Sequence, residues 1–225
     1  MGGNIGLPIL AQDPLPEGGA YVLELSSYQI DLTQSLDCDV AVLLNITPDH
    51  LDRYDSFEAY AASKERLFEM QSKAHWGVIA DVSLRGISLR DKDGPGNWAL
   101  PPEGIERPGW ESKQRDWPSL QGPHNEQNAW AAYHACLWAG VGLKTDQILE
   151  AMKTFPGLPH RMERIREKDG VLFVNDSKAT NPTATAPALA AFPKIRWILG
   201  GQAKTDNLDE CTPYFGHVAA AYTIG

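Results

Sequence analysis

Lys64 is the side chain whose position most clearly points to chemistry. At 100° per residue along the helix expected from residue 56 to about residue 70, it shares one apolar stripe with Phe57, Tyr60, Ala61, Leu67 and Phe68. Two interpretations stay open. In one, the methylenes pack while the ammonium reaches solvent. In the other, the amine points into a site, where desolvation lowers its pKa and makes it available for modification or catalysis.

Glu24 is the second candidate, because it interrupts the apolar strand expected at residues 21–25, and a buried carboxylate needs a partner. Asp49 and His50 follow the strand expected at residues 40–46 and offer a hard oxygen and an imidazole. With a modified Lys64, Glu24 and His50 favour a magnesium site, and their spacing does not match structural zinc. For His50 alone, the alternative is an ordinary hydrogen-bonded loop histidine.

Polar clusters follow four of the expected strands. Ligands of open α/β sheets bind beyond the carboxyl ends of the strands, so these clusters predict a cleft between two α/β units. The clusters lie at residues 24–27, 45–50, 175–181 and 200–204.

Two further positions suit anions. Asn125 stands near the start of an expected helix, where plain capping is the alternative, and Arg161 follows His160 on a linker, where the alternative is a surface arginine. The pattern GxxxxGK[ST] occurs nowhere in the chain, and the glycines at positions 2, 3 and 6 make no nucleotide fingerprint.

The expected elements alternate between strands and helices, which predicts an α/β fold with parallel sheets. Two prolines and a glycine within residues 155–159 read as a linker. We therefore expect one domain at residues 1–158 and a second, incomplete one at residues 159–225.

Composition narrows the class of protein. The 225 residues carry a net charge of −9, which argues against a nucleic-acid binder. No apolar run reaches the length of a membrane span, and no signal peptide is visible. The three separated cysteines predict reduced thiols in a cytoplasmic protein.

Read together, these strings resemble the Mur ligases, the ATP-dependent amino-acid-adding enzymes of peptidoglycan synthesis. The runs at residues 23–27 and 176–181 resemble members that add D-glutamate, whereas members that add the third residue usually carry a Tyr-Ala-His type sequence at residues 176–180. The matching segments follow the family's order and lie at residues 3–6, 23–29, 45–54, Tyr60 with Lys64, 122–125, 157–161, 175–181, and 200–201 with Lys204.

The resemblance implies the parallel sheet of a truncated P-loop-type central ATPase domain, followed by part of a Rossmann-like C-terminal domain. It implies ATP and Mg²⁺, and a reaction in which ATP phosphorylates the carboxylate of UDP-N-acetylmuramoyl-L-alanine before the amine of D-glutamate displaces phosphate. These small molecules are the expected partners. The expected protein is a cytoplasmic monomer that serves cell-wall biogenesis, cell shape and cell division.

The resemblance also assigns roles to residues. The catalytic set is Glu24, His50, Lys64 and Lys178, in which Glu24 helps hold a first magnesium while His50 and a carbamylated Lys64 serve a second. The residues implied to face the UDP-sugar are Asn4, Ser26 and His50. Those implied to contact ATP are Asn125, His160, Arg161 and Asp176. Those implied to position D-glutamate and the acyl group are Lys178, Thr180 and Lys204.

Departures from the family pattern suggest a fragment. The family's phosphate loop is expected shortly before Asn4, with the UDP-binding domain further upstream and more of the last domain after residue 225. We therefore expect the 225 residues alone to be inactive. The alternatives are a non-catalytic binding remnant and a ligase like folylpolyglutamate synthase. A metal hydrolase built on Glu24, Asp49 and His50 is disfavoured because it lacks a second histidine at helical spacing.

Overall fold

The structure is a computed structural model that describes residues 1–4, 6–47, 53–81, 83–84, 94–101, 110–202 and 207–224. The chain divides into two compact units. The first comprises Met1–Arg107 and Trp130–Leu149, and the second comprises Pro108–Ala129 and Glu150–Gly225. The domain boundary expected between residues 158 and 159 stays a prediction, and the division into compact units does not follow it.

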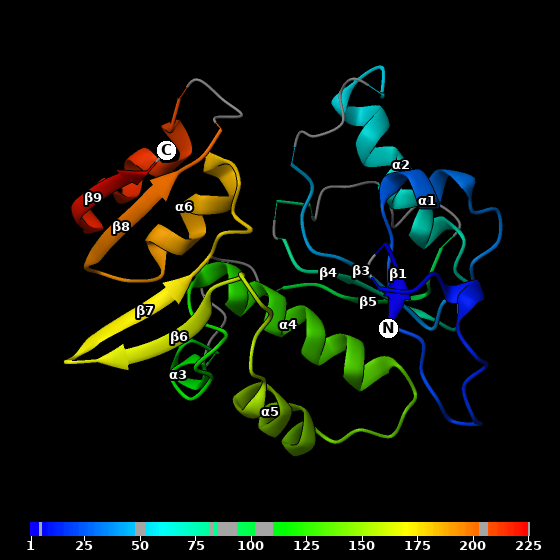
Figure 1. The fold of residues 1–225 in the computed structure, drawn as a ribbon. Helices are drawn as coiled ribbons and strands as arrows, with labels where there is room; N and C mark the ends of the chain where they lie inside the picture. The colour runs from blue at the N-terminus through cyan, green and yellow to red at the C-terminus, as the bar shows by residue number, and fades with distance from the viewer. Residues whose placement is uncertain are drawn as a thin grey trace. The chain divides into compact units, whose positions relative to one another are not determined.

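Parallel strands make up the sheets of the first unit, as the sequence predicts (Figure 1). β1 (Gly2–Gly3) pairs with β2 (Leu23–Glu24). A separate three-stranded sheet has the order β3 (Val40–Leu43), β4 (Trp76–Ile79) and β5 (Asn97–Ala99). The carboxyl ends of β3 and β4 therefore point the same way, which is the arrangement that open α/β sheets use to hold ligands.

Two α-helices of the first unit each begin at a serine side chain that caps them. η1 (Ile9–Ala11) is a single turn, and α1 (Ser27–Leu32) follows directly on β2. α2 (Phe57–Glu69) begins after Ser56, whose hydroxyl accepts a hydrogen bond from the Ala59 amide at 3.2 Å, so the predicted cap is confirmed. The core of this unit joins α2 to the three-stranded sheet through Ala41, Leu43, Phe68 and Ile79.

Two longer helices confirm the helical pattern predicted in the middle of the chain. α4 (Pro123–Trp138) begins two residues before the expected start, because proline suits the first turn of a helix. The Trp138 ring stacks on Trp76 of β4 with centroids 3.9 Å apart and planes 5° from parallel. α5 (Thr145–Thr154) begins at the predicted residue.

The second unit contains a hairpin that the sequence reading missed. The hairpin is the antiparallel pair of β6 (Glu163–Lys168) and β7 (Val171–Asn175). The short helix α3 (Trp110–Gln114) also belongs to this unit. The reading predicted β7 but not β6. Asp169 and Gly170 join the strands with φ of 52° and 72°, which is the left-handed backbone that a two-residue hairpin turn requires.

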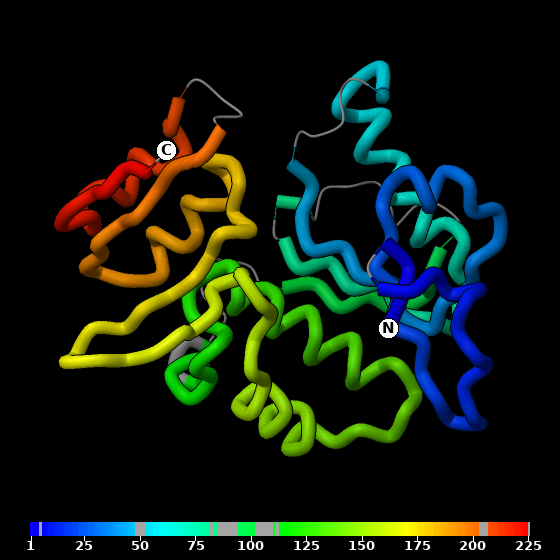
Figure 2. Tube along the Cα trace, viewed as in Figure 1, coloured from blue at the N-terminus to red at the C-terminus, as the bar shows by residue number. Residues whose placement is uncertain are grey.

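The remainder of the second unit is α/β. α6 (Pro182–Ala190), β8 (Ile195–Gly200), η4 (Asp209–His217) and β9 (Val218–Ile224) follow one another, and β8 pairs with β9 in parallel (Figure 2). Ala186, Leu189 and Cys211 form its buried core, against which partly buried side chains of both strands pack.

Two predictions from composition can be compared with the described residues. Cys38, Cys136 and Cys211 are all free thiols, as predicted, and burial raises the pKa of Cys38 to about 11, so it stays protonated. In the described part of the chain, none of the helices has the length and apolar character needed to cross a membrane.

Candidate active site

Asn4 and Glu24, two of the predicted site residues, form a pair at the ends of β1 and β2. The Asn4 backbone amide donates to the Glu24 carbonyl at 2.7 Å, and its side-chain amide donates to Glu24 Oε1 at 3.0 Å. Gly3 makes this approach possible, because its φ is +99° and a Cβ there would overlap the carbonyl oxygen of Glu24. The pairing of β1 with β2 thus holds the Asn4 and Glu24 side chains at the same end of this two-stranded sheet.

The expectation that Glu24 is buried is wrong. Its side chain is exposed, because β2 is only two residues long and the preceding Tyr21 and Val22 are exposed as well. The partner that the carboxylate needs is the amide of Asn4. As a hard oxygen donor at a strand end, this carboxylate fits the donor preference of Mg²⁺.

Ser26 has a structural task in the described contacts. Its hydroxyl accepts from the Gln29 amide at 3.3 Å, while the Gln29 side chain accepts from the Ser26 amide at 2.9 Å. This reciprocal capping box begins α1 directly after the Glu24 strand. The predicted contact of Ser26 with the UDP-sugar stays a prediction.

Lys64 lies beside the buried face of α2 rather than in its middle. Tyr60 and Phe68 of the predicted stripe are buried, but the buried polar residue is Ser63, and Lys64 is only half-buried. The Lys64 ammonium lies over the Tyr60 ring, with Nζ 5.0 Å from the centroid. The remaining apolar residues of the stripe, Phe57, Ala61 and Leu67, are partly buried. The predicted apolar face is therefore correct, but Lys64 does not lie at its centre.

The predicted magnesium set of Glu24, His50 and Lys64 stays a prediction. His50 lies outside the described residues, as do Asp49 and Lys204. Within the parts of the chain that the structure describes, no group of three or more His, Cys, Asp or Glu side chains is arranged to hold a metal ion.

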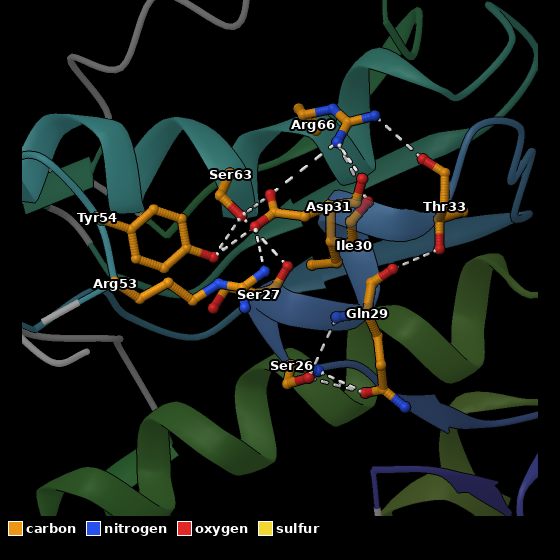
Figure 3. Close-up of polar contacts among 10 residues, drawn as sticks. All are labelled: Ser26, Ser27, Gln29, Ile30, Asp31, Thr33, Arg53, Tyr54, Ser63 and Arg66. Atoms are coloured by element: carbon orange, nitrogen blue, oxygen red, sulfur yellow. Dashed lines mark hydrogen bonds and ion pairs between the residues drawn. The ribbon is translucent and has the colours of Figure 1, made fainter. Parts of the chain in front are cut away.

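The sequence reading missed a network centred on Asp31 of α1, shown in Figure 3. Ser63 of α2 donates to Asp31 Oδ1 at 2.6 Å, and the hydroxyl of Tyr54 donates to Oδ2 at 2.7 Å. Ser63 also donates to the carbonyl of Ser27 at 3.3 Å. The only sequence signal was one aspartate at the polar end of a short helix, and its partners lie 23 and 32 residues away.

Two arginines complete this network. Arg53 and Arg66 approach the Asp31 carboxylate at 3.8 and 4.0 Å. Partial burial raises the pKa of Asp31, but hydrogen bonds from Ser63 and Tyr54 and the two positive charges outweigh it and hold that pKa below 3.8. The carboxylate is therefore ionised at pH 7, and through Ser63 and Arg66 it joins α1 to α2.

In the second unit, the structure joins two predicted segments, the turn at His160 and the loop after β7. The Lys178 amide donates to the His160 carbonyl at 3.1 Å, and the Met162 amide donates to Asp176 Oδ1 at 2.9 Å. Asn175 Nδ2 lies 2.8 Å from His160 Nδ1. Residues 160 and 162 both have positive φ, so this turn is held in an uncommon backbone conformation.

Asp176, in the loop joined to the His160 turn, has a raised pKa. Burial raises its pKa, while the Met162 amide and the charge of Arg161 act in the opposite direction. The side chains of Arg161, Lys178 and Thr180 are exposed. The charge of Arg161 near a partly buried carboxylate suits a phosphate with its bound metal, which is the ATP contact expected of these two residues.

Asn125 lies in the first turn of α4, close to the predicted helix start. Its side-chain amide donates to the Gln121 carbonyl at 3.0 Å, so it closes the turn before the helix. Gly122 has φ of +90°, and a Cβ there would lie 2.9 Å from the Cβ of Ala191. Burial lowers the pKa of the neighbouring His124, which is therefore neutral at pH 7.

Comparison with known proteins shows which family the chain is similar to. Residues 2–90 match the Mur ligase middle domain. All of the chain aligns, at 58% identity over 226 residues, with the UDP-N-acetylmuramoylalanine--D-glutamate ligase of Novosphingobium aromaticivorans. The chain is therefore similar to Mur ligases along its whole length, and its residues 2–90 match their middle domain. A relative of the same name from Zymomonas mobilis is 54% identical over 225 residues, again along the whole chain. The chain spans about half the length of these curated relatives, 50% in both cases.

Solved Mur ligases share the fold. MurF from Acinetobacter baumannii superposes with a TM-score of 0.55 at 17% identity, over 89% of this chain and 55% of that one. MurF ligase from Thermotoga maritima, solved in complex with ADP, gives 0.56 at 19% identity, over 84% and 49%. At these identities the similarity concerns the fold alone, and it confirms the predicted α/β class with parallel sheets.

Proposed function

We propose that the protein is an ATP-dependent ligase that adds D-glutamate to UDP-N-acetylmuramoyl-L-alanine in peptidoglycan synthesis. The observation that carries this proposal is the 58% identity, along the whole chain, with a relative named for that reaction. The Asp-Ser-Lys-Ala-Thr-Asn run at residues 176–181 supports the D-glutamate step in particular.

The proposed reaction has two steps. The alanine carboxylate attacks the γ-phosphorus of ATP, and ADP leaves. The D-glutamate amine then attacks the acyl phosphate, and phosphate leaves as the amide forms and the nitrogen loses a proton. Each step brings anions together, so cationic side chains and Mg²⁺ are needed to stabilise the transferring phosphoryl group.

In the first unit, Asn4, Glu24, Ser26, His50 and Lys64 are proposed to serve the UDP-sugar and the metal ions. Glu24 is a suitable Mg²⁺ ligand because it is an exposed carboxylate oriented by Asn4. Lys64 is proposed to be carbamylated: its ammonium loses a proton, the neutral amine adds CO₂ and releases a second proton, and a cationic side chain thereby becomes a metal-binding carbamate. Bound Mg²⁺ would supply charge neutralisation for the phosphoryl transfer.

In the second unit, the residues proposed to bind ATP and D-glutamate are Asn125, His160, Arg161, Asp176, Lys178, Thr180 and Lys204. The hydrogen bonds that join the His160 turn to the Asp176 loop support this assignment, because they keep the exposed Arg161 and Lys178 on neighbouring segments. We further propose that the protein acts as a cytoplasmic monomer.

A phosphate-release assay tests the proposal. The protein as its native gene encodes it should release phosphate from ATP with UDP-N-acetylmuramoyl-L-alanine and D-glutamate, and should form the amide product. Little release is expected when L-lysine or diaminopimelate replaces D-glutamate, and equal release with either would assign the protein to the next step. Amide formation with a pteridine substrate and L-glutamate would favour the folylpolyglutamate synthase alternative.

Lys64 and the isolated chain have their own tests. Lys64→Ala should abolish activity, and a short carboxylic acid should restore part of it by replacing the carbamate. Full activity in Lys64→Ala would remove the metal-ligand role. The 225-residue chain alone should give no amide in a single-turnover experiment, because it lacks a GxxxxGK[ST] loop.

A further inference from the structure

Asp31 takes no part in the chemistry proposed above, yet it joins the two helices that carry or follow the proposed site residues of the first unit. α1 begins three residues after Glu24, and α2 carries Lys64. Ser63, the residue directly before Lys64, donates both to Asp31 Oδ1 at 2.6 Å and to the Ser27 carbonyl at 3.3 Å. The Asp31 carboxylate therefore anchors α2 next to Lys64.

A second contact of α2 prevents its rotation. Arg66 lies one turn from Ser63 and donates to the carbonyls of Asp31 at 3.1 Å and Thr33 at 3.0 Å, at the carboxyl end of α1. Rotating α2 about its axis would break both contacts. Because neighbouring helical side chains differ by about 100° in direction, fixing Ser63 and Arg66 fixes the direction of Lys64 as well.

A chain of aromatic contacts runs from the same carboxylate to the Lys64 amine. The Tyr54 hydroxyl donates to Asp31 Oδ2 at 2.7 Å (Figure 3). The Tyr54 ring packs against Tyr60 with centroids 5.3 Å apart, and Tyr60 is 5% exposed. Lys64 Nζ lies 5.0 Å from the Tyr60 centroid. Asp31 thus contacts α2, the helix that carries Lys64. It also contacts Tyr54, which packs against the Tyr60 ring that the Lys64 amine lies over.

We propose that Asp31 is a positioning residue for Lys64. It acts through Ser63 and Tyr54, and it keeps the amine over the ring of Tyr60. The catalytic consequence rests on the proposed ligase function, whereas the effect on the direction and accessibility of the amine does not.

Amine labelling tests the positioning directly. The protein as its native gene encodes it is acetylated with limiting acetic anhydride in bicarbonate-free buffer, and the labelling rates of Lys64 and the exposed Lys73 are compared by mass spectrometry. Asp31→Asn should raise the Lys64 to Lys73 ratio about fivefold, the factor for one lost hydrogen bond of ordinary strength. Tyr54→Phe should raise the Lys64 to Lys73 ratio by a smaller factor. If Asp31→Asn does not fold, the ratio measured in Tyr54→Phe tests the proposal instead.

Asp37→Asn is the matched control. The Asp37 carboxylate also joins two segments of the first unit, since it accepts from the Ser72 amide at 2.7 Å and contacts His75 Nδ1 at 2.7 Å. Ser72 and His75 lie outside α1 and away from Tyr54 in the sequence, so the loss of the Asp37 carboxylate should leave the Lys64 ratio at the wild-type value. An unchanged ratio in Asp31→Asn and Tyr54→Phe, or an equal rise in Asp37→Asn, would overturn the proposal.

Kinetics separate positioning from simple loss of fold. Asp31→Asn should lower kcat about tenfold and leave the KM for ATP unchanged, because a displaced group slows the reaction while none of the residues proposed to contact ATP is changed. A fall in kcat without a change in Lys64 labelling counts against positioning. If the wild type shows no ligase activity, the proposed function fails, and the labelling ratio still decides the role of Asp31.

Discussion

Asp31 and Asp176, one in each compact unit, have pKa values shifted in opposite directions. Asp31 accepts hydrogen bonds from two side-chain hydroxyls and lies near two arginines, and all four contacts lower its pKa. Asp176 accepts one backbone amide, and burial raises its pKa despite Arg161. The Asp31 carboxylate is engaged in contacts within its own unit. We expect the Asp176 carboxylate to accept a further hydrogen bond from a ligand.

The difference extends to the regions around them. In the first unit, side chains from distant segments meet and hold α1 and α2 together. In the second, the turn at His160 and the loop after β7 are joined by backbone bonds and include positive φ, and four predicted site residues have exposed side chains: His160, Arg161, Lys178 and Thr180. Substitutions in the Asp31 network should therefore cost stability, whereas substitutions at the exposed site residues of the second unit should mainly cost activity.

The largest effect on stability is expected at Asp31. Asp31→Asn should lower the free energy of unfolding by about 2 kcal/mol at pH 7, because donors at both carboxylate oxygens lose a charged acceptor. Since the folded pKa lies below the ordinary 3.8, the stabilisation is complete above pH 3.8 and lost as the pH falls through the folded value. Urea denaturation at pH 7 and below pH 3.8 measures this, and a difference that does not shrink in acid contradicts it.

A smaller loss is expected in the hairpin turn of the second unit. Gly170→Ala should cost about 1 kcal/mol, because its φ of +72° strains any other residue although open space surrounds it. Gly216→Ala is the control, since that glycine also has open space but no positive φ, and it should be nearly neutral. Equal denaturation midpoints for the two variants would show that backbone conformation does not govern this region.

Asp176→Asn should have the opposite sign. The amide oxygen keeps the bond from Met162, and removing a charge that burial disfavours should stabilise the protein at pH 7 by no more than about 0.5 kcal/mol, since the half-buried group is screened by solvent. Because the folded pKa is raised, the gain appears as the pH rises through that value and vanishes below 3.8. Thermal unfolding across pH measures the gain, while ligase activity should fall.

The smallest effects on stability are expected at Arg161 and Lys178. Alanine at either exposed position should change the free energy of unfolding by less than about 0.5 kcal/mol. The phosphate-release rate should nevertheless fall at least about tenfold, because a charge that stabilises the transferring phosphoryl group is lost. Lys168→Ala, at an exposed position of β6, is the control, and it should leave both quantities unchanged.

Local chemistry explains why much of the fold could be predicted. Ser56 and the spacing of Tyr60 and Phe68 predict α2, because capping and a period of 3.6 residues act within one helix. β6 could not be found from apolar runs, since residues 163–168 are mostly charged and the hairpin is exposed. The turn pair Asp169-Gly170 was the signal that could have revealed it.

The sequence by itself determined which polar residues follow the strands and the order in which they occur, and these sufficed to indicate the Mur ligase family. Only the tertiary structure decided that Glu24 is exposed beside Asn4, that Ser63 rather than Lys64 is buried, and that Asp31 joins α1 to α2. The physical reason is that periodicity gives the direction of a side chain about its own helix or strand. The group it meets there depends on how elements far apart in the chain pack together.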